Sequence, residues 1–385
     1  MIDPRLAPFH SVPKVPLYPE VYRAYPSPES PRDVIETFMT AHMRSEPGRM
    51  FLGASGTAML LAYFRHRMLY RGDREVAIPS FSCPELYAAA LHAGLRVFLY
   101  ELSDRGELTF DSIKDVVTSG VRLLVWPLFF CYTPRPQELL DYAHAHEVSV
   151  IYDEAQSFPL IYRQDVQHPA HCASLISFGR SKKLSCSGGG AIVLYEKSMQ
   201  NYEFDSTLSE LVHANPFPVE SSPKASFTRL DELLAFRGVP SVSCGAMPHR
   251  IMVEVAAKLA HYRDYEVCLG MRFQKLREFV VEVFGESALL WTSDYNVPST
   301  FGLQVVASRR FEIMDELRKQ GVQTTWYYYP LHVQPHVRSA HKSEFLGTNQ
   351  LASSILILPC KISHSLKDIN YVGESLWEVK RLLGL

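Results

Sequence analysis

The sequence predicts an α/β protein in which helices sandwich a mostly parallel sheet, with a smaller α+β domain at the C-terminal end. Between residues 57 and 196, short apolar runs alternate with segments whose apolar spacing suits helices packed on a sheet. The runs are apolar at successive positions, which is typical of parallel strands buried on both faces. From about residue 245 the pattern changes to one long helix followed by short strands. We therefore expect an N-terminal arm over 1–30, a large domain over 31–245 and a small domain over 246–385.

The expected elements follow from these patterns in chain order. The first thirty residues are rich in proline, so we expect an extended arm before a helix at 31–45. In the large domain we predict helices at 57–70, 85–94 and 136–147, and strands at 75–80, 96–101, 122–129, 148–153, 174–178 and 191–196. In the small domain we predict one long helix at 249–284, strands at 302–308, 323–329 and 354–359, and a final helix at 365–383.

Composition and charge exclude several classes of protein. The 385 residues include 39 Lys and Arg against 41 Asp and Glu, and no basic run indicates a nucleic-acid partner. No apolar segment approaches the roughly 20 residues that span a bilayer, and the start lacks the apolar core of a signal peptide. The seven cysteines are scattered without a CxxC motif, which argues against a disulfide framework and against a zinc cluster. We expect a cytoplasmic protein with no metal, no nucleic-acid partner and no membrane partner.

Small residues precede the first helix of the large domain, in GASGTA at 53–58. Such residues let backbone N–H groups approach a ligand, and the N-terminus of a helix favours an anion. A phosphate would then lie at the start of this helix. The alternative is an ordinary helix cap formed by the hydroxyl group of Ser55 or Thr57.

A carboxylate ends the predicted strand at 148–153. Asp153 is in a costly position for a charge unless the carboxylate meets a cation or several hydrogen-bond donors. Gln156 follows three residues later and is expected to point into the same space. The alternative for Asp153 is the capping of a helix.

The stretch SFGRSKKLSCSGGG, at 177–190, follows the next strand. Its lysines precede its glycines, so it does not match a nucleotide-binding loop, in which the lysine follows the glycines. A lysine just beyond a strand, in a partly desolvated cleft, has the lowered amine pKa that carbonyl chemistry requires. The glycines would then let the chain turn tightly back into the next strand. The alternative is a pair of surface lysines in a hairpin-like turn.

Aromatic residues gather late in the chain, in WYYYPLH at 326–332. They are interpreted either as a wall of a substrate pocket or as a core strand that ends in a proline turn.

Together these features fit one cofactor, pyridoxal 5′-phosphate. This cofactor needs a lysine amine for its aldehyde, a carboxylate for its ring nitrogen, and a small-residue backbone for its phosphate. Asp153 and Lys182 follow neighbouring strands and meet the first two needs, and the segment 53–58 meets the third.

The sequence resembles the DegT/StrS-type sugar aminotransferases, a group with the aspartate-aminotransferase-like fold. The resemblance runs from about residue 30 to the end, in order through GASGTAMLLA, AIPSFSCPELYAAALHAGLRVFLYEL, YDEAQSFP, SFGRSKKLSCSGGGAIVL, HRIMVEVAAKL, YYYPLH and the closing helix. It implies fold type I of the pyridoxal phosphate enzymes, with a seven-stranded sheet, a cofactor-binding large domain, and a homodimer.

The resemblance also implies roles for particular residues. Lys182 is the lysine that binds the cofactor covalently, and Asp153 pairs with the ring nitrogen; both are catalytic. Gln156 contacts the phenolic oxygen of the ring, while Gly56, Thr57 and Ser177, together with Ser55, hold the phosphate. His332 and Tyr329 line the substrate pocket. Lys183 points elsewhere and is structural.

Three positions depart from the family pattern. Cys83 occupies the place of an aromatic residue that stacks on the cofactor, so stacking is either weaker or supplied by Phe81 or another residue. Arg180 replaces a proline and either pairs with the cofactor phosphate or a substrate anion, or faces solvent in a turn. Pro248 replaces an asparagine that reaches the phosphate of the partner subunit. These changes indicate a divergent branch.

The implied reaction moves an amino group from an amino acid, glutamate or glutamine, to a keto sugar or a sugar-derived biosynthetic intermediate. Sugar dehydration on the same fold is an alternative, although that branch typically has histidine where this chain has Lys182. A second alternative is a sensor or an inactive partner protein that binds the cofactor without turnover.

Overall fold

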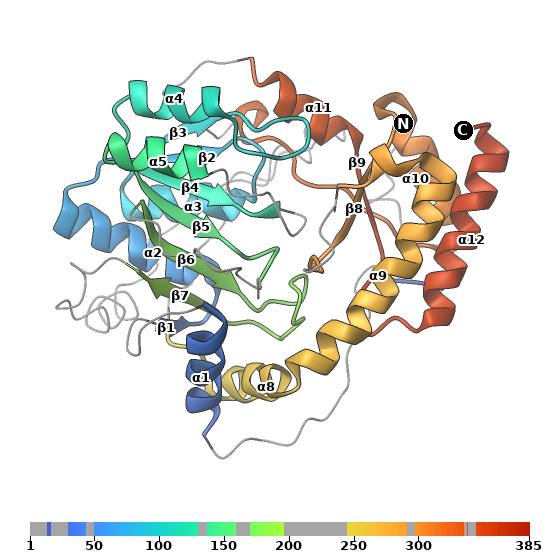
Figure 1. The fold of residues 1–385 in the computed structure, drawn as a ribbon, viewed down its shortest axis with the longest axis horizontal. Helices are drawn as coiled ribbons and strands as arrows, with labels where there is room; N and C mark the ends of the chain where they lie inside the picture. Colours follow the sequence, from blue (N-terminus) through green and yellow to red (C-terminus); the bar gives the residue numbers. More distant parts are fainter. Residues whose placement is uncertain are drawn as a thin grey trace, which may run out of the picture.

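A seven-stranded sheet organises the N-terminal part of the molecule (Figure 1). The structure is a computed structural model that describes residues 14–16, 30–43, 50–129, 137–158, 170–195, 245–290, 297–334, 337 and 344–385. The strands are β1 (Met50–Gly53), β2 (Glu75–Pro79), β3 (Arg96–Tyr100), β4 (Leu123–Pro127), β5 (Ser149–Asp153), β6 (His171–Ser177) and β7 (Gly190–Leu194). Their order is β1-β7-β6-β5-β4-β2-β3, with β7 antiparallel to both neighbours and the other pairs parallel. The predicted fold class is confirmed.

Helices cover both faces of this sheet. Helices α2 (Gly56–His66) and α3 (Pro84–Ala93) pack in one apolar layer with Val125 and Ile151 of the strands. Helices α4 (Phe110–Thr118) and α5 (Gln137–Ala145) pack in another layer with Leu124 and Tyr152. Neighbouring residues of one strand thus enter different apolar layers, and this is why the strands are apolar at every position.

A third apolar layer joins the end of the sheet to two helices outside it. Helix α1 (Pro31–Met43) and helix α8 (His249–Ala260) pack together and against β7, around Ile35, Val193 and Val255. Helix α8 therefore lies where the loop between β6 and β7 emerges from the sheet.

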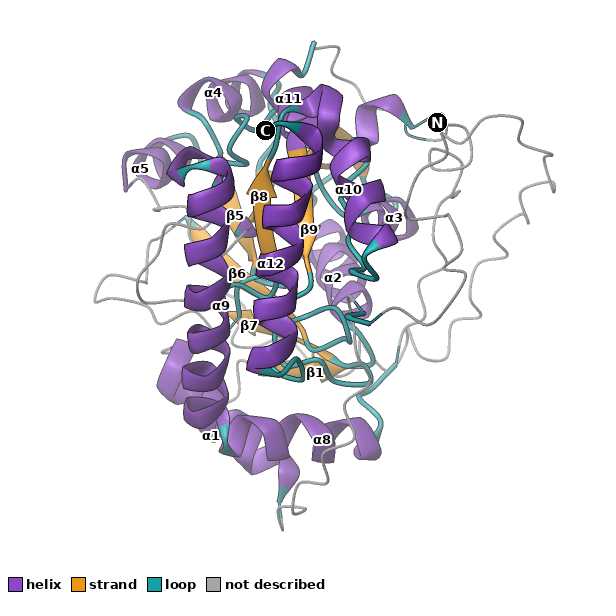
Figure 2. Ribbon diagram, turned by 90° about the vertical axis from the view of Figure 1, so that its right-hand side faces the viewer, coloured by secondary structure: helices purple, strands orange, loops and turns teal. Residues whose placement is uncertain are grey.

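The C-terminal part contains a small antiparallel pair of strands, β8 (Phe301–Gln304) and β9 (Ile355–Leu358). Helices α9 (Tyr262–Phe284), α10 (Arg310–Lys319) and α12 (Leu366–Leu383) pack on them, and α9 and α12 lie side by side (Figure 2). Helix α11 (Leu346–Ser354) leads into β9. The sheet and this part share one apolar cluster, so the core runs between them.

Two predicted elements of the C-terminal part were wrong. The long helix at 249–284 is two helices, because α8 ends at Ala260 and α9 begins at Tyr262 in a different direction (Figure 1). The segment 323–329 forms no strand beyond an isolated bridge between Thr325 and Ile357. Its aromatic content matches a strand, but Trp326 is buried in the core and Tyr328 contacts the ring of Phe81. Strand β1 and helices α4, α10 and α11 were not predicted.

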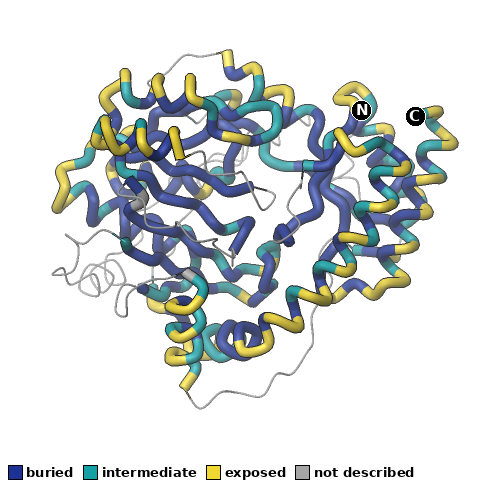
Figure 3. Tube along the Cα trace, in the orientation of Figure 1, coloured by how far each residue is buried: buried dark blue, intermediate teal, exposed yellow. Residues whose placement is uncertain are grey.

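Burial follows the layers, with buried strands and exposed outer faces on α9 and α12 (Figure 3). Within the described ranges, no helix has the length and apolar character needed to cross a membrane. The described cysteines are free thiols. The proposed arm lies mostly outside the described residues, and the division into domains stays a prediction.

Candidate active site

Three strand ends and one helix start meet at one edge of the large sheet. Ser177 ends β6 and pairs across the sheet with Gly190, the first residue of β7. Gly190 also pairs with Gly53, the last residue of β1, and α2 begins three residues later at Gly56. Asp153 ends the neighbouring strand β5. Three of the segments singled out in the sequence therefore converge: 53–58, the strand end at Asp153, and 177–190.

The N-terminus of α2 lies directly against Ser177. A methyl group added to Gly56 would lie 3.1 Å from Cβ of Ser177 and 3.5 Å from its Oγ. Ser55 is the N-cap residue, and its Oγ accepts a hydrogen bond of 3.0 Å from the amide of Ala58. The Ser55 hydroxyl therefore caps helix α2, as the alternative interpretation expected. The first residue of the helix lies beside the Ser177 hydroxyl. This is the arrangement that binds a phosphate.

The glycines of the stretch 188–190 make this close approach possible. A methyl group on Gly190 would lie 2.2 Å from the backbone N of Gly56, so only glycine lets β7 pass beneath the start of α2. Gly189 has a φ of +90°, and its amide donates a 2.9 Å hydrogen bond to the carbonyl of Ala54. The glycines shape the site through packing and do not themselves form a nucleotide-binding loop.

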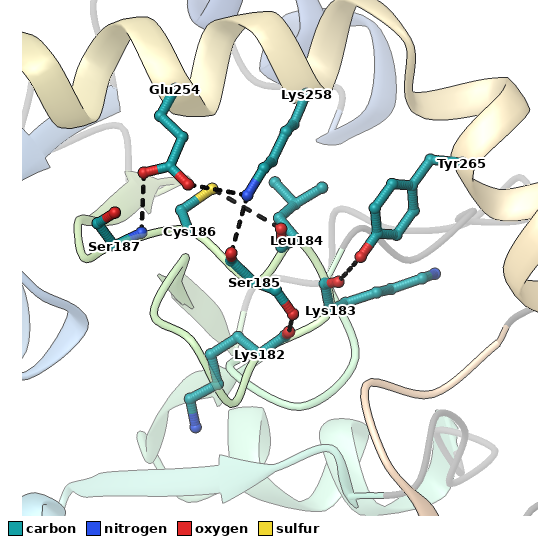
Figure 4. A network of polar contacts seen from close by, with 9 residues as sticks. All are labelled: Lys182, Lys183, Leu184, Ser185, Cys186, Ser187, Glu254, Lys258 and Tyr265. Carbon is teal, nitrogen blue, oxygen red and sulfur yellow. Dashed lines mark hydrogen bonds and ion pairs between the residues drawn. The ribbon is translucent and has the colours of Figure 1, made fainter. Parts of the chain in front are cut away.

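Lys182 lies in the loop between β6 and β7, and helix α8 holds that loop (Figure 4). The Lys258 ammonium donates a 2.8 Å hydrogen bond to the carbonyl of Ser185, and Glu254 accepts one of 2.9 Å from the amide of Ser187. Burial opposes ionisation of Glu254, but the hydrogen bonds from Lys258 and Ser187 outweigh it and lower the pKa of the carboxyl group. The backbone around Lys182 is thereby fixed from outside the site.

The two adjacent lysines have different environments. The Lys183 side chain is 1% exposed, and its Nζ lies 2.8 Å from the hydroxyl of Tyr262 and 2.7 Å from Oε1 of Glu266. The Lys182 side chain points away from this network (Figure 4). Lys183 therefore anchors the loop to α9.

Asp153, Cys83 and Lys182 interact electrostatically. Burial raises the pKa of the Asp153 carboxyl group, and the Lys182 ammonium counteracts that rise. The amide of Ala155 donates a 3.0 Å hydrogen bond to Oδ1 of Asp153. Burial also raises the pKa of the Cys83 thiol to about 11, with Lys182 again acting in the opposite direction. Cys83 thus lies among the polar groups of the site, whereas Phe81 is fully buried beside Phe129 and Tyr328 and presents no face for stacking.

Gln156 is held by residues of the C-terminal part. Its Nε2 donates a 3.0 Å hydrogen bond to the hydroxyl of Tyr328. Its Oε1 accepts hydrogen bonds from the hydroxyls of Ser299 and Thr300. Its backbone carbonyl accepts a third, of 3.0 Å, from the amide of Ser299. The sequence had pointed to Tyr328 only as part of an aromatic run and gave no signal for Ser299 or Thr300.

Glu85 is a site residue that the sequence reasoning missed. Its carboxylate accepts a hydrogen bond from the hydroxyl of Thr57, and its charge contributes to the raised pKa values of Asp153 and Cys83. It lies in the first turn of α3, where an acidic residue is also favourable for the helix. A carboxylate beside the start of α2 competes with any anion that binds there.

Arg180 and Pro248 are both exposed. The Arg180 side chain has no hydrogen bond or ion pair with another residue in the described part of the chain. Pro248 is the N-cap residue of α8 and provides no side-chain hydrogen bond. The contact of Arg180 with a phosphate or a substrate anion therefore stays a prediction.

His332 lies at the end of β2, and Tyr329 precedes it by three residues. The Nδ1 of His332 is 2.6 Å from the hydroxyl of Ser80, which follows β2, and its ring stacks on Phe345 at 4.4 Å. Burial lowers the pKa of His332. Tyr329 is half-buried, and its carbonyl accepts a hydrogen bond of 2.9 Å from Gln334. Their proposed contact with substrate stays a prediction.

These residues fit pyridoxal phosphate, with one exception. A buried carboxylate coupled to a lysine suits the ring nitrogen and the aldehyde, and the start of α2 with Ser177 suits the phosphate. The exception is Glu85, because its carboxylate is bonded to the Thr57 hydroxyl and would repel a phosphate there.

A family model described as the DegT/DnrJ/EryC1/StrS aminotransferase family matches residues 52–377. The match contains every candidate site residue described above. No curated protein sequence matches the chain.

Solved structures share the fold. The aminotransferase TlmJ from Streptoalloteichus hindustanus has a TM-score of 0.72 at 16% identity, with 96% of this chain and 100% of that chain covered. NtdA from Bacillus subtilis, with the bound cofactor PMP, has a TM-score of 0.71 at 17% identity, with 92% and 78% covered. The sugar aminotransferase CalS13 from Micromonospora echinospora has a TM-score of 0.66 at 16% identity, with 94% and 99% covered. At these identities the likeness shows the fold alone, which is that of fold-type-I aminotransferases.

Proposed function

The chain belongs to the DegT/DnrJ/EryC1/StrS aminotransferase family, whose cofactor is pyridoxal phosphate, and we propose that it aminates a keto sugar or a sugar-derived biosynthetic intermediate. The amino donor in this proposal is glutamate or glutamine. The observation that carries the proposal is a buried Asp153 within electrostatic reach of Lys182, beside the start of α2. The structural similarity to CalS13, a sugar aminotransferase, supports the class of acceptor.

Particular residues would hold the cofactor. The amides at Gly56 and Thr57, with the hydroxyl of Ser177, would bind the phosphate, since they line the start of α2. Asp153 would face the ring nitrogen and Gln156 the phenolic oxygen, and Cys83 would lie beside the ring. Arg180 is placed in the same loop as Lys182 and would add a cation at the phosphate or at a substrate anion.

Each catalytic side chain has a defined task in this proposal. The bound cofactor supplies an aldehyde that carries the amino group and a ring that accepts the electron pair left at the substrate Cα. The Lys182 amine would hold the cofactor through that aldehyde at rest, and as a free amine it would remove the proton from the substrate Cα and deliver a proton to the aldehyde carbon. The Asp153 carboxylate keeps a proton on the ring nitrogen, which makes the ring a better electron acceptor.

The environment of Asp153 suits this task. Burial opposes its charge, so the carboxylate gains most when a cation lies next to it. A protonated ring nitrogen would be such a cation. His332 and Tyr329 would line the acceptor pocket at the same edge of the sheet.

We also propose that the enzyme works as a cytoplasmic homodimer. Arg180 and Pro248 are exposed in the single chain beside the loop that carries Lys182, as expected for residues near a subunit boundary. Light scattering of the active protein tests the assembly, and a fully active monomer would contradict it.

The variant Lys182→Ala tests the proposal directly. We expect it to lose the visible absorption band of lysine-bound cofactor, and to lose turnover by at least roughly 10³-fold, because no other described amine takes the same position. Lys183→Ala removes the adjacent lysine and is the matched control; it is expected to be less stable but to keep the band. A visible band that persists in Lys182→Ala would exclude the assignment.

A second function, that of a cofactor sensor or an inactive partner protein, is supported by Glu85, whose carboxylate accepts the hydrogen bond of the Thr57 hydroxyl. A protein with a weakened phosphate site is compatible with a cofactor sensor or an inactive partner. Adding glutamate and, separately, glutamine to the purified holoprotein separates the two, because an aminotransferase loses its visible band with its donor as the amino group moves, and a sensor keeps the band with both.

A further inference from the structure

A second lysine, Lys361, lies buried behind the loop that carries Lys182. It follows β9 in the C-terminal part and is 5% exposed. Its Nζ donates a 2.9 Å hydrogen bond to the backbone carbonyl of Ser181 and another to the backbone carbonyl of Ser299. An ammonium group in a protein interior is costly unless such acceptors surround it, so these two contacts fix its position.

Both acceptors belong to segments of the candidate active site. Ser181 directly precedes Lys182 in the chain. Ser299 donates its hydroxyl to Oε1 of Gln156 and its amide to the Gln156 carbonyl. Lys361 therefore lies between the segment that carries the covalent lysine and the segment that holds the glutamine.

Resting on the proposed function, we propose that Lys361 is a positioning residue that sets Lys182 and Gln156 relative to each other, so that both reach the same bound cofactor. Lys182 would contact the aldehyde and Gln156 the neighbouring phenolic oxygen. A shift of either segment would therefore prevent the two side chains from contacting the cofactor at the same time. A single ammonium group that bonds to both segments removes their freedom to shift independently.

The charges around Lys361 agree with this position. Burial, together with a smaller effect of the Lys182 charge, lowers the pKa of Lys361 to about 7, which places the two lysines within electrostatic reach of each other. The other titratable groups that face Lys361 are Cys360 beside it and His364, whose imidazole pKa burial lowers, with a smaller effect of Lys361.

The experiment compares Lys361→Met with Lys367→Met, a lysine on the exposed start of α12. Apoprotein is titrated with pyridoxal phosphate, and both the Kd and the visible spectrum are recorded. We expect Lys361→Met to bind pyridoxal phosphate at least about tenfold more weakly than the wild type. This is the effect expected for losing one or two hydrogen bonds to a charged group. We also expect a changed ratio of the absorption bands, because Gln156 no longer meets the phenolic oxygen. Lys367→Met should match the wild type in both.

A merely structural role would give a different result. Lys361→Met would then melt at a lower temperature but keep the wild-type Kd and band ratio, and that outcome overturns the proposal. Should Lys361→Met not fold, Lys361→Gln keeps a donor too short to reach both carbonyls, and a wild-type Kd and band ratio in that variant overturn it equally. A wild type that binds pyridoxal phosphate without any lysine-dependent visible band would instead overturn the proposed function, so the two failures are distinct.

Discussion

At the scale of single residues, the site depends on a carboxylate whose burial opposes its charge. We expect Asp153→Asn to bind pyridoxal phosphate within about threefold of the wild type but to lose at least about 10²-fold in kcat, because asparagine cannot hold a proton on the ring nitrogen. Titration of the apoprotein gives the first quantity and single-turnover kinetics with glutamate give the second. Near-normal turnover would count against the role of Asp153.

Glu85 leads to a prediction of the opposite sign. Its carboxylate bonds to Thr57 where the cofactor phosphate would lie, so we expect Glu85→Gln to tighten binding of pyridoxal phosphate by roughly three- to tenfold through the loss of one like charge. Pyridoxal, which has no phosphate, is the matched ligand and should bind the variant and the wild type equally. A Kd for pyridoxal phosphate that is unchanged or weaker in Glu85→Gln would show that the carboxylate does not oppose the phosphate.

The sequence identified those site residues whose type is costly or unusual where they occur. A carboxylate at a strand end and two lysines next to a glycine run drew attention to these positions, and the family resemblance then assigned roles to Asp153 and Lys182. Glu85, Ser299 and Lys361 were missed because their residue types are ordinary in their local sequence. What makes them relevant is a contact with a residue far away in the chain, and no local pattern records such a contact.

At the scale of elements, the parallel strands were predictable because each one is apolar on both faces. The strand β1 was not, since four residues are too few to distinguish a strand from a turn. The segment 323–329 misled for the reverse reason: its aromatic residues suit a strand, but here they fill the core between the two sheets. The helix at 249–284 keeps its periodicity across His261, so sequence gave no sign of the change in direction there.

The close approach of β7 to α2 gives a prediction for these elements. Gly190→Ala would place a methyl group 2.2 Å from the backbone of Gly56, so we expect a loss of about 3 kcal/mol or more in stability and weaker phosphate binding as α2 moves from Ser177. Gly188→Ala is the matched control, because the nearest atom there is the flexible end of Ile251 at 3.1 Å, and should cost under about 1 kcal/mol. Urea unfolding measures both, and equal losses would contradict the packing argument.

At the scale of the whole molecule, the C-terminal part contributes a buried lysine, Lys361, to the loop between β6 and β7. Folding lowers the pKa of Lys361 from 10.5 to about 7, so the unfolded chain binds one more proton than the folded chain between these values. The cost of burying this lysine is therefore fully present below pH 7 and is relieved as the pH rises. The sign means that Lys361 makes the apoprotein relatively more stable at pH 9 than at pH 7.

Urea unfolding of the apoprotein at pH 7, 8 and 9 tests this sign. The free energy of unfolding of the wild type, measured relative to Lys361→Met, is expected to rise by about 2 kcal/mol across that range. Taking the difference cancels the cysteines and other groups that titrate in both proteins. Parallel curves for the two proteins would mean that Lys361 keeps an ordinary pKa.

In the proposed function, the contrast between Lys182 and its neighbour would decide which amine the cofactor aldehyde modifies. Two lysines adjacent in the chain have nearly the same access to a diffusing electrophile in an unfolded peptide, and a mixture of products would follow. In the folded chain, Glu266 and Tyr262 engage the Lys183 nitrogen, which is almost completely shielded from solvent. The fold thus supplies regioselectivity: helix α9 protects one nitrogen, and the aldehyde is left with the other.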